Sequence, residues 1–279
     1  MKPGGIYPHV IRLPSILKVL LATIVLSAGS VTAITIASPA GTPVRQASIA
    51  LIIDDLGNKY AQDSEAIALP GLVSCAFLPY APFTPRLAQQ AHAVGKEVLL
   101  HLPMQAVNEE PSEPGELTLD MSRAQLVRTL QQDLAAVPHA CGVNNHKGSL
   151  LTRHPGHMAW LMQELNRQGG LYFVDSRTTV ATVARQLAVE NRIPSIERKV
   201  FLDNLQTPGA IRAQFRRLLD IAHREGTALA IGHPHTETLA VLRQELSRLD
   251  AYNVQLVPVS RLIEIEHTRK QIWQASLSR

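Results

Sequence analysis

Two common catalytic signatures are missing from this chain of 279 residues. It has no glycine-rich motif for binding nucleotide phosphates and no GxSxG pattern for a nucleophilic serine. Aromatic residues make up only 4% of the sequence, which counts against a long groove that binds sugars by stacking. Candidate chemistry must therefore be sought in other side chains.

Acidic residues are absent from the first 37 positions. Basic residues come first, an apolar run from Val19 to Val31 follows, and Ala33 stands at a small-residue cleavage position. We therefore expect residues 1–37 to be a signal peptide and the protein to be exported, to the periplasm or beyond. Because Val19–Ala37 is 19 residues long, a retained leader can also serve as an inner-membrane anchor. We expect membrane contact through an uncleaved leader only.

Net charge is small once the leader is set aside. The whole chain has a formal charge of +4, but Lys2, Arg12 and Lys18 belong to the leader. The mature part then has 24 basic residues against 23 acidic ones, a net charge of about +1. This balance gives no support to a nucleic-acid partner.

Export would place the two cysteines, Cys75 and Cys141, in a compartment where disulfides persist. Both lie in apolar, strand-like runs, where buried free thiols are common. The sequence therefore allows either a disulfide between Cys75 and Cys141 or two free thiols.

Short β-branched runs alternate with helical patterns from Ser48 onward, which favours parallel strands joined by crossover helices. Capping patterns predict helix starts at Thr84, Ser122 and Thr207. Seven or eight strand–helix units predict an α/β fold, a single distorted (β/α) barrel. The expected strands are Ser48–Ile53, Val73–Phe77, Glu97–Leu100, Cys141–Asn144, Leu171–Val174, Lys199–Leu202, Ala228–Ile231 and Gln255–Val257.

No repeat or flexible linker divides this region. We expect a polar linker over residues 38–47, the barrel over residues 48–267 and a C-terminal tail over residues 268–279. The segment Asn108–Leu119 is rich in Pro, Glu and Gly, and we expect it to be an excursion loop near the site.

Two adjacent carboxylates, Asp54 and Asp55, directly follow the first expected strand. Barrel enzymes assemble their sites at the carboxyl ends of the strands. A metal ligand plus a general base is the functional interpretation of the pair. The alternative is that Asp54–Asn58 is merely a turn, because Asp, Gly and Asn all favour turns.

Histidines lie at three other strand ends. His101 follows the third expected strand, where an imidazole suits Zn²⁺ or a similar ion. His146 follows the fourth strand, where the amides of Asn144 and Asn145 can orient the ring, although a lone histidine is often structural. His233 and His235 follow the seventh strand and titrate near neutrality, so either can be a general acid.

Two further carboxylates, Asp175 and Asp203, also follow expected strands. Each can take part in the site, cap the following helix or neutralise an arginine. The residues alone leave these roles open.

Read in order, several segments resemble the divergent polysaccharide deacetylase family, a branch of the NodB-homology carbohydrate esterases. The resemblance implies a distorted NodB-like barrel that holds a divalent metal, usually zinc, and hydrolyses N-acetyl groups of an amino-sugar polymer. It also implies a cell-wall or extracellular glycan as the partner. The segments are IALIIDDLGN, EVLLHLPMQ, GVNNHKGSLLT, YFVDSRTT, FLDN and AIGHPHTETLAVL, spread from residue 49 to residue 242.

The metal site that the resemblance implies departs from the family pattern at one position. The family divides its first aspartate pair into base and ligand, which implies Asp54 as base and Asp55 as ligand. Its H-x-x-x-H pattern begins at His101, but the second histidine falls on Gln105. His146 is our candidate replacement, so the implied ligands are Asp55, His101 and His146.

The family also uses a late histidine as general acid, and His233 or His235 fits that place. Supporting or substrate-positioning roles fall to four other residues: Asn145, Asp175, Arg177 and Asp203.

Two other functions stay open. A periplasmic binding or scaffold protein would keep the barrel without turnover, and metal binding without hydrolysis would identify it. Another metal hydrolase, such as a phosphodiesterase or an amidase, would use the same residue types. Phosphate substrates predict more cations at strand ends than Lys147, Arg177 and Arg198.

Overall fold

The computed structural model describes residues 46–108 and 111–277. The expected leader, residues 1–37, and the linker as far as residue 45 lie outside this part of the chain. Within the described part, no helix is both long enough and apolar enough to cross a bilayer. Cys75 and Cys141 are free thiols.

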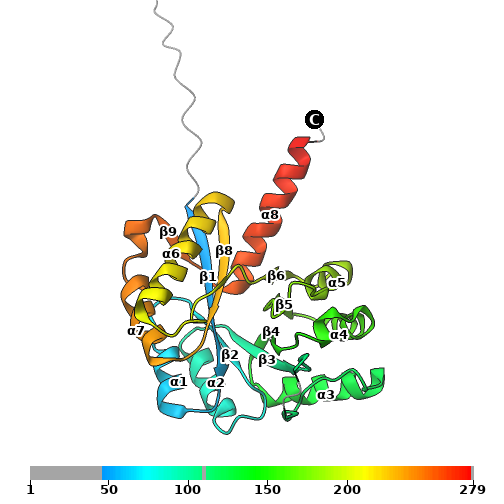
Figure 1. The fold of residues 1–279 in the computed structure, drawn as a ribbon. Helices are drawn as coiled ribbons and strands as arrows, with labels where there is room; N and C mark the ends of the chain where they lie inside the picture. Colours follow the sequence, from blue (N-terminus) through cyan, green and yellow to red (C-terminus); the bar gives the residue numbers. More distant parts are fainter. Residues whose placement is uncertain (1–45, 109–110, 278–279) are drawn as a thin grey trace, which may run out of the picture. The chain divides into compact units, whose positions relative to one another are not determined.

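Parallel strands form the centre of the fold (Figure 1). Eight of them lie in the order β6, β5, β4, β3, β2, β1, β8, β7 and curl into a half-barrel, which confirms the predicted fold class. A further strand, β9, pairs with the first residues of β1. The strands are β1 (Ala47–Leu56), β2 (Ser74–Phe77), β3 (Val98–Met104), β4 (Ala140–Lys147), β5 (Tyr172–Asp175), β6 (Ser195–Glu197), β7 (Val200–Phe201), β8 (Thr227–Gly232) and β9 (Val254–Leu256).

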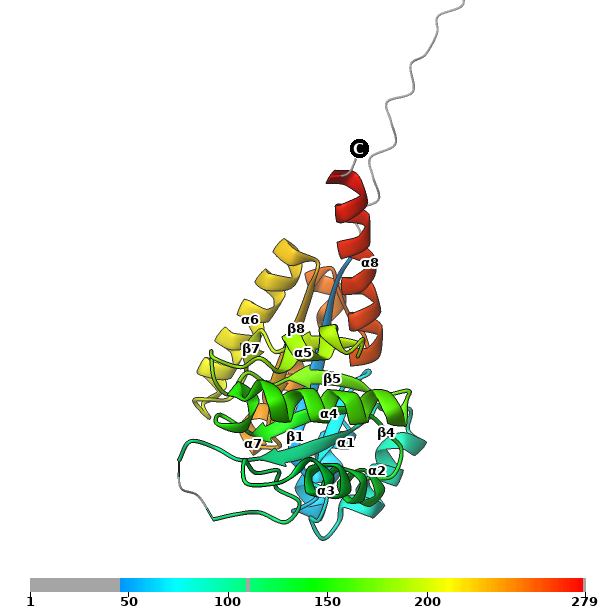
Figure 2. The ribbon, with the colours of Figure 1, turned by 90° about the vertical axis from the view of Figure 1, so that its right-hand side faces the viewer.

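Helices lie on both faces of the curled sheet: all but the last cover its outside, and the last, α8, packs its first turns against the inside (Figures 1 and 2). They are α1 (Tyr60–Ile67), α2 (Thr84–Ala93), α3 (Arg123–Ala136), α4 (Pro155–Gln168), α5 (Ala184–Glu190), α6 (Pro208–Glu225), α7 (Thr236–Leu246) and α8 (Val259–Leu277), with short 3₁₀ helices at Leu151–Arg153 and Leu249–Tyr252.

The predicted helix caps hold at two of three positions. Ser122 and Gln125 form the capping box of α3, and Thr207 accepts a hydrogen bond from Ala210 at the start of α6. The expectation for Thr84 is wrong, because its hydroxyl donates to the carbonyl of Leu78 at 2.6 Å and so is not the N-cap of α2.

The two faces of the curled sheet bury separate apolar clusters. Because side chains alternate along a strand, β1 sends Ile49, Leu51 and Ile53 to the cluster under α1–α7, and Ala50 and Ile52 to the inner face. The first turns of α8 pack into the inner cluster. Burial of a large apolar side chain stabilises the fold by about 1.5–3 kcal/mol, so both faces hold the strands in place.

One segment joins the two edges of the sheet. Strands β6 and β7 are separated only by Arg198 and Lys199, whose N–H groups donate to the carbonyls of Asp175 and Leu229. The segment thus pairs with β5 through its first half and with β8 through its second. Sequence reasoning missed β6, because three residues are too few to show a strand period.

Two strands run farther than predicted. His101 lies inside β3, and His146 lies inside β4. Both strands therefore carry their histidines on paired backbone, which restricts the movement of the side chains.

Candidate active site

Inward-facing side chains become polar at the carboxyl ends of the strands. On the inner face, Ile52 is followed two positions later by Asp54, and Leu99 is followed by His101. His233 likewise lies two positions beyond Ile231. The pleat of the strands thus gathers these polar groups above the inner apolar cluster.

A bulge in β1 lets two neighbouring aspartates serve one site. Regular alternation would point Asp54 and Asp55 to opposite faces. The pairing of β1 with β2 shifts register between Ile53 and Leu56, and Asp55 adopts a left-handed φ of 60°. Aspartate tolerates this conformation better than most residues. The turn begins only at Gly57, after both carboxylates.

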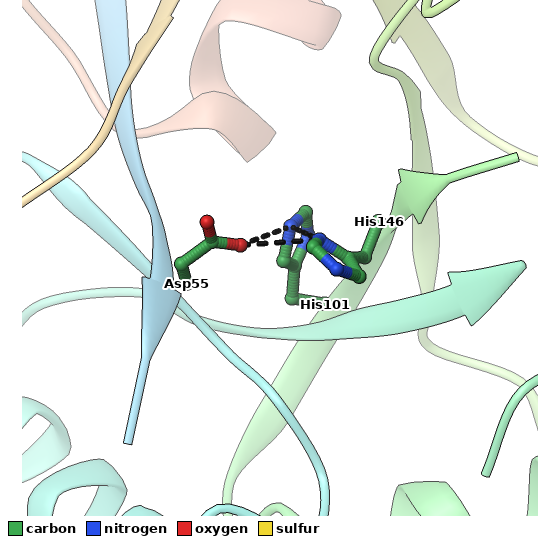
Figure 3. Close-up of side chains that lie close together, drawn as sticks. All are labelled: Asp55, His101 and His146. Atoms are coloured by element: carbon green, nitrogen blue, oxygen red, sulfur yellow. Dashed lines mark hydrogen bonds and ion pairs between the residues drawn. The ribbon is translucent and has the colours of Figure 1, made fainter. Parts of the chain in front are cut away.

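Asp55, His101 and His146 bring three ligand atoms together (Figure 3). Asp55 Oδ1 lies 3.2 Å from His101 Nε2 and 3.1 Å from His146 Nδ1, and the two nitrogens lie 3.0 Å apart. Neighbouring ligands of a tetrahedral zinc ion are about 3.3 Å apart, given bonds of about 2.0–2.1 Å. The triangle therefore has nearly the size of one face of such a site.

Asp55 Oδ1 also lacks a well-aligned hydrogen bond, although it is buried. A buried carboxylate oxygen without a donor is costly unless a cation binds it. This atom therefore fits a metal ligand better than a structural carboxylate.

The outer nitrogen of each imidazole faces an oxygen. His101 Nδ1 lies 3.0 Å from Asn144 Oδ1, and His146 Nε2 lies 3.3 Å from Glu113 Oε2. With a metal ion bound, each outer N–H would donate to that oxygen, and the lone pairs of His101 Nε2 and His146 Nδ1 would face the ion. These tautomers are the ones that metal binding requires.

Burial and charge give the two aspartates different protonation behaviour. Burial raises the pKa of Asp54, and the positive charges of His101 and His233 oppose this only in part. Burial also disfavours ionised Asp55, but the neighbouring imidazoles of His101 and His146 hold its pKa well below its usual range. Asp55 is therefore ionised, as a ligand must be, while Asp54 can take up a proton as a base must.

Asn144 links Asp54 to the candidate metal ligands Asp55, His101 and His146, which we call the metal cluster. Its side-chain NH₂ donates to Asp54 Oδ1 at 2.8 Å while its carbonyl faces His101. Sequence reasoning expected the amides of Asn144 and Asn145 to orient the His146 ring, but Asn144 contacts His101 instead. Asn145 Oδ1 accepts from the Ser176 N–H at 2.9 Å, because its side chain points to the next strand and not to an imidazole.

His233 faces the site and is held by Asp203. Its Nδ1 lies 3.0 Å from Asp203 Oδ1, and its Nε2 lies 3.7 Å from Asp55 Oδ2. Burial disfavours the charged imidazole, but the Asp203 hydrogen bond, together with the charges of Asp54, Asp55 and Asp203, outweighs this and raises the pKa of His233 to about 9. The ring of His235 contacts Gln206 instead. Geometry therefore favours His233 as the general acid.

Asp203, His233 and His235 form a second group with ligand atoms within 4.8 Å. The Asp203 carboxylate already accepts from the His233 N–H, the His233 ring and the Thr238 hydroxyl. These bonds account for the arrangement as an orienting partner of His233.

Two cavities meet at the metal cluster. One has a volume of about 650 Å³ and is lined by Asp54, His101 and His233 among others. The other, of about 320 Å³, shares Asp55 and His146 with it. An extended ligand can therefore lie across the cluster.

A family model described as divergent polysaccharide deacetylase matches residues 51–263. The chain belongs to the divergent polysaccharide deacetylase family. This member of the family is 39% identical over 222 residues to the uncharacterized protein YibQ of Escherichia coli, covering 80% of this chain and 69% of that protein.

Solved structures share the fold of this deacetylase-family chain. An uncharacterized protein of Agrobacterium tumefaciens has a TM-score of 0.75 and 22% identity, over 81% of this chain and 92% of its own. The peptidoglycan deacetylase PdaC of Bacillus subtilis has a TM-score of 0.52 and 12% identity, over 85% of this chain and 99% of its own. The half-barrel is therefore NodB-like, as predicted.

Asp175 and Arg177 support the site from the loop after β5. Asp175 accepts from the Arg177 N–H at 2.8 Å and from the Thr182 hydroxyl at 2.9 Å, so it organises this loop. Arg177 lines the larger cavity and pairs with Glu197 at 3.0 Å. In this deacetylase-family fold, Arg177 can therefore contact a molecule bound in the larger cavity. Asp175 is not among the residues that line that cavity.

Glu113 is the residue of this site that sequence reasoning missed. It belongs to the excursion loop, and its contact with His146 confirms that the loop lies near the site. Gln105, where the family pattern has its second histidine, accepts from the Leu119 N–H at 2.9 Å and anchors the same loop. The loop has no periodic pattern, so only its acidic composition could have pointed to Glu113.

We expect Glu113→Gln to weaken zinc binding by about 10–100-fold, as is usual for loss of a partner that orients a ligand. Glutamine keeps an oxygen near His146 Nε2 but loses the charge that makes the ring a stronger ligand. Competition with a chromogenic chelator measures the affinity. Glu116→Gln removes an equal charge from the same loop, and equal losses in both variants would contradict a specific role for Glu113.

Proposed function

We propose that this protein is an exported, metal-dependent hydrolase that removes N-acetyl groups from an amino-sugar glycan of the cell wall or the extracellular space. The observation that carries the proposal is the triangle of Asp55, His101 and His146 beside Asp54 and an Asp203-oriented His233. Membership of the deacetylase family supports a glycan substrate. The leader pattern over residues 1–37 supports export to the periplasm, with an inner-membrane anchor if the leader is retained.

The donor set suits zinc. Zn²⁺ takes imidazole nitrogens and carboxylate oxygens, and three protein ligands leave a fourth position for water or substrate. Held by Asp55, His101 and His146, a divalent ion would polarise the acetamide carbonyl and lower the pKa of water toward about 7.

The side chains of this protein would carry the protons. Asp54, with Oδ1 fixed by Asn144, accepts with its other oxygen a proton from the attacking water. The water oxygen adds to the carbonyl carbon, and the carbon–nitrogen bond then breaks. His233 protonates the departing amine through Nε2, so the products are acetate and a free amino sugar.

Release of acetate tests the proposal. The full chain, reconstituted with zinc, is incubated with N-acetylglucosamine oligomers and with peptidoglycan fragments. We expect acetate and new amines in equal amounts, lost after chelation and restored by zinc. A protein that binds zinc and releases neither product would instead have the binding or scaffold function.

The fall in turnover at alkaline pH should follow the deprotonation of His233. A general acid must be protonated, so activity falls as pH rises through its pKa, about 9 before the charge of a bound ion lowers it. We expect Asp203→Asn to move this limb to lower pH, because the carboxylate that raises the His233 pKa is gone. Profiles of kcat/KM against pH measure the shift. Asp175→Asn is the control, and an unmoved limb in Asp203→Asn would exclude His233 as the acid.

A further inference from the structure

Basic side chains line the larger cavity beside the metal cluster. Within the described part of the chain, its only carboxylates are Asp54 and Asp55, which the proposed reaction already uses. The positive charge is local, because the chain after residue 37 is nearly neutral. The cationic residues are Lys147, Arg177, Arg198, Lys199 and Arg217.

Three of the five are paired with carboxylates. Lys147 Nζ lies 2.6 Å from Glu113. Arg177 Nη1 and Lys199 Nζ lie 3.0 Å and 3.1 Å from Glu197. Their charge is therefore largely compensated within the protein.

Arg198 is held by backbone carbonyls and by the Phe201 ring, whose centroid lies 5.1 Å from its guanidinium carbon. Its Nε donates to the Ser176 carbonyl at 2.6 Å and its Nη2 to the Arg177 carbonyl at 2.9 Å. A guanidinium has five N–H groups, so several remain for a ligand.

Burial and the charge of Arg177 lower the pKa of Arg198, and the charges of Asp54 and Asp175 oppose this only in part. Within residues 46–108 and 111–277, Arg198 forms no direct ion pair with a carboxylate. A partly buried cation of this kind is stabilised when an anion binds.

Arg217 faces the same cavity from α6. It is exposed, and among the described residues its guanidinium has neither an ion pair nor a hydrogen bond. Two arginines from different elements therefore offer donors to one ligand, and guanidinium groups bind carboxylates and phosphates in bidentate fashion.

The cavity on the other side of the cluster has a different character. Tyr80 and several prolines line it, and within the described ranges it contains no lysine or arginine. Lysines and arginines thus lie on one side of the metal cluster only. This difference in charge orients a ligand that extends across the cluster.

We propose that Arg198 and Arg217 form an anion-binding subsite, so that the substrate is an N-acetylated glycan with a carboxylate or phosphate group close to the scissile acetamide. This inference rests on the proposed function. The anionic group binds on the arginine side, and an uncharged sugar lies on the side of Tyr80.

Calorimetric titration of the full chain tests the subsite apart from turnover. The protein is Asp54→Asn with zinc, which cannot use Asp54 as a base. The probes are three tetrasaccharides: neutral tetra-N-acetylchitotetraose, a peptide-free glycan with lactyl carboxylates, and an N-acetylated glycan with phosphate groups. We expect a charged probe to bind about tenfold more tightly at low salt, with the difference reduced by added salt. The two charged probes tell which anion the site prefers.

Substitutions assign the preference to the arginines. Arg217→Gln is expected to remove most of the difference between charged and neutral probes, and Arg198→Gln all of it, with Arg198→Lys keeping part. Arg216→Gln removes the same charge from the same helix outside the cavity lining and is expected to keep the preference. Because Arg198 also holds a loop, Arg217 is the decisive position if Arg198→Gln fails to fold.

The outcomes separate this inference from the proposed function. Equal binding of all three probes, or the same loss in Arg216→Gln as in Arg217→Gln, overturns the subsite even if acetate is released from neutral glycans. A charged preference that depends on Arg217, in a wild-type protein that releases no acetate, keeps the subsite and refutes the hydrolase.

Discussion

Alanine at position 101 is expected to abolish stoichiometric zinc binding. His101 Nε2 is one of three ligand atoms, and its ring is buried and held on its other side by Asn144. Loss of a residue that only orients a ligand costs about 10–100-fold in affinity, so loss of the ligand itself should cost more than about 100-fold. Elemental analysis of the dialysed protein should find about one equivalent of zinc in the wild type and almost none in the variant.

His235→Ala is the matched control. His235 belongs to the second group of possible ligands, with Asp203 and His233. Zinc retained in His235→Ala and lost in His101→Ala places the ion at Asp55, His101 and His146. The reverse pattern would place it at the second group, and the proposed mechanism would fail.

The second large effect is expected for Asp54→Asn, which should reduce acetate release by about 10²–10⁴-fold, the usual contribution of a general base. Asparagine preserves the shape of the side chain but cannot accept the proton. Zinc should stay bound, because Asp54 Oδ2 lies 3.6 Å from His101 Nε2, outside the triangle of ligand atoms. Turnover and zinc content are measured on the same preparation.

The melting temperature of Asp54→Asn shows whether its loss of turnover comes from unfolding. The folded state raises the pKa of Asp54, so at neutral pH its ionised form costs stability. Asp54→Asn removes that cost, and the melting temperature should stay the same or rise. Glu164→Gln, which neutralises a buried carboxylate of α4 outside the linings of both cavities, should keep full turnover. Turnover by Asp54→Asn near the wild-type rate would refute the role of Asp54 as base.

Local patterns predicted most of the side chains that meet at the candidate site. Asp54, His101 and His233 each follow an apolar run, and strand alternation puts each on the same face as the inward residue two positions before it. Position along the chain is enough to see this. The choice between His233 and His235 needed the contacts of Asp203 and Gln206, which join distant parts of the chain.

The spacing of residues along the chain could not predict which residues lie opposite each other on paired strands. The family pattern has its second histidine four residues after the position of His101, but this chain has Gln105 there. In the structure β3 pairs with β4 so that His146 lies opposite Pro103, and its ring reaches His101 from the neighbouring strand. The position of His146 at a strand end marked it as a candidate, and the family resemblance made it the replacement ligand.

Other residues were missed because they do not end strands. Glu113 comes from a loop without a period, and Arg217 from the exposed surface of a helix. The bulge that turns Asp55 toward the histidines depends on strand register and backbone conformation. Residue types alone do not predict either of these.

The segment that joins β6 and β7 has a consequence for behaviour in solution. An open sheet has two edge strands whose free N–H and C=O groups can pair with other chains and start aggregation. Here the edge strands have only three and two residues, and they belong to one continuous stretch. Neither is long enough to act as a template for an incoming strand. The stretch that brings Arg198 and Lys199 to the cavity thus also protects the sheet from self-association.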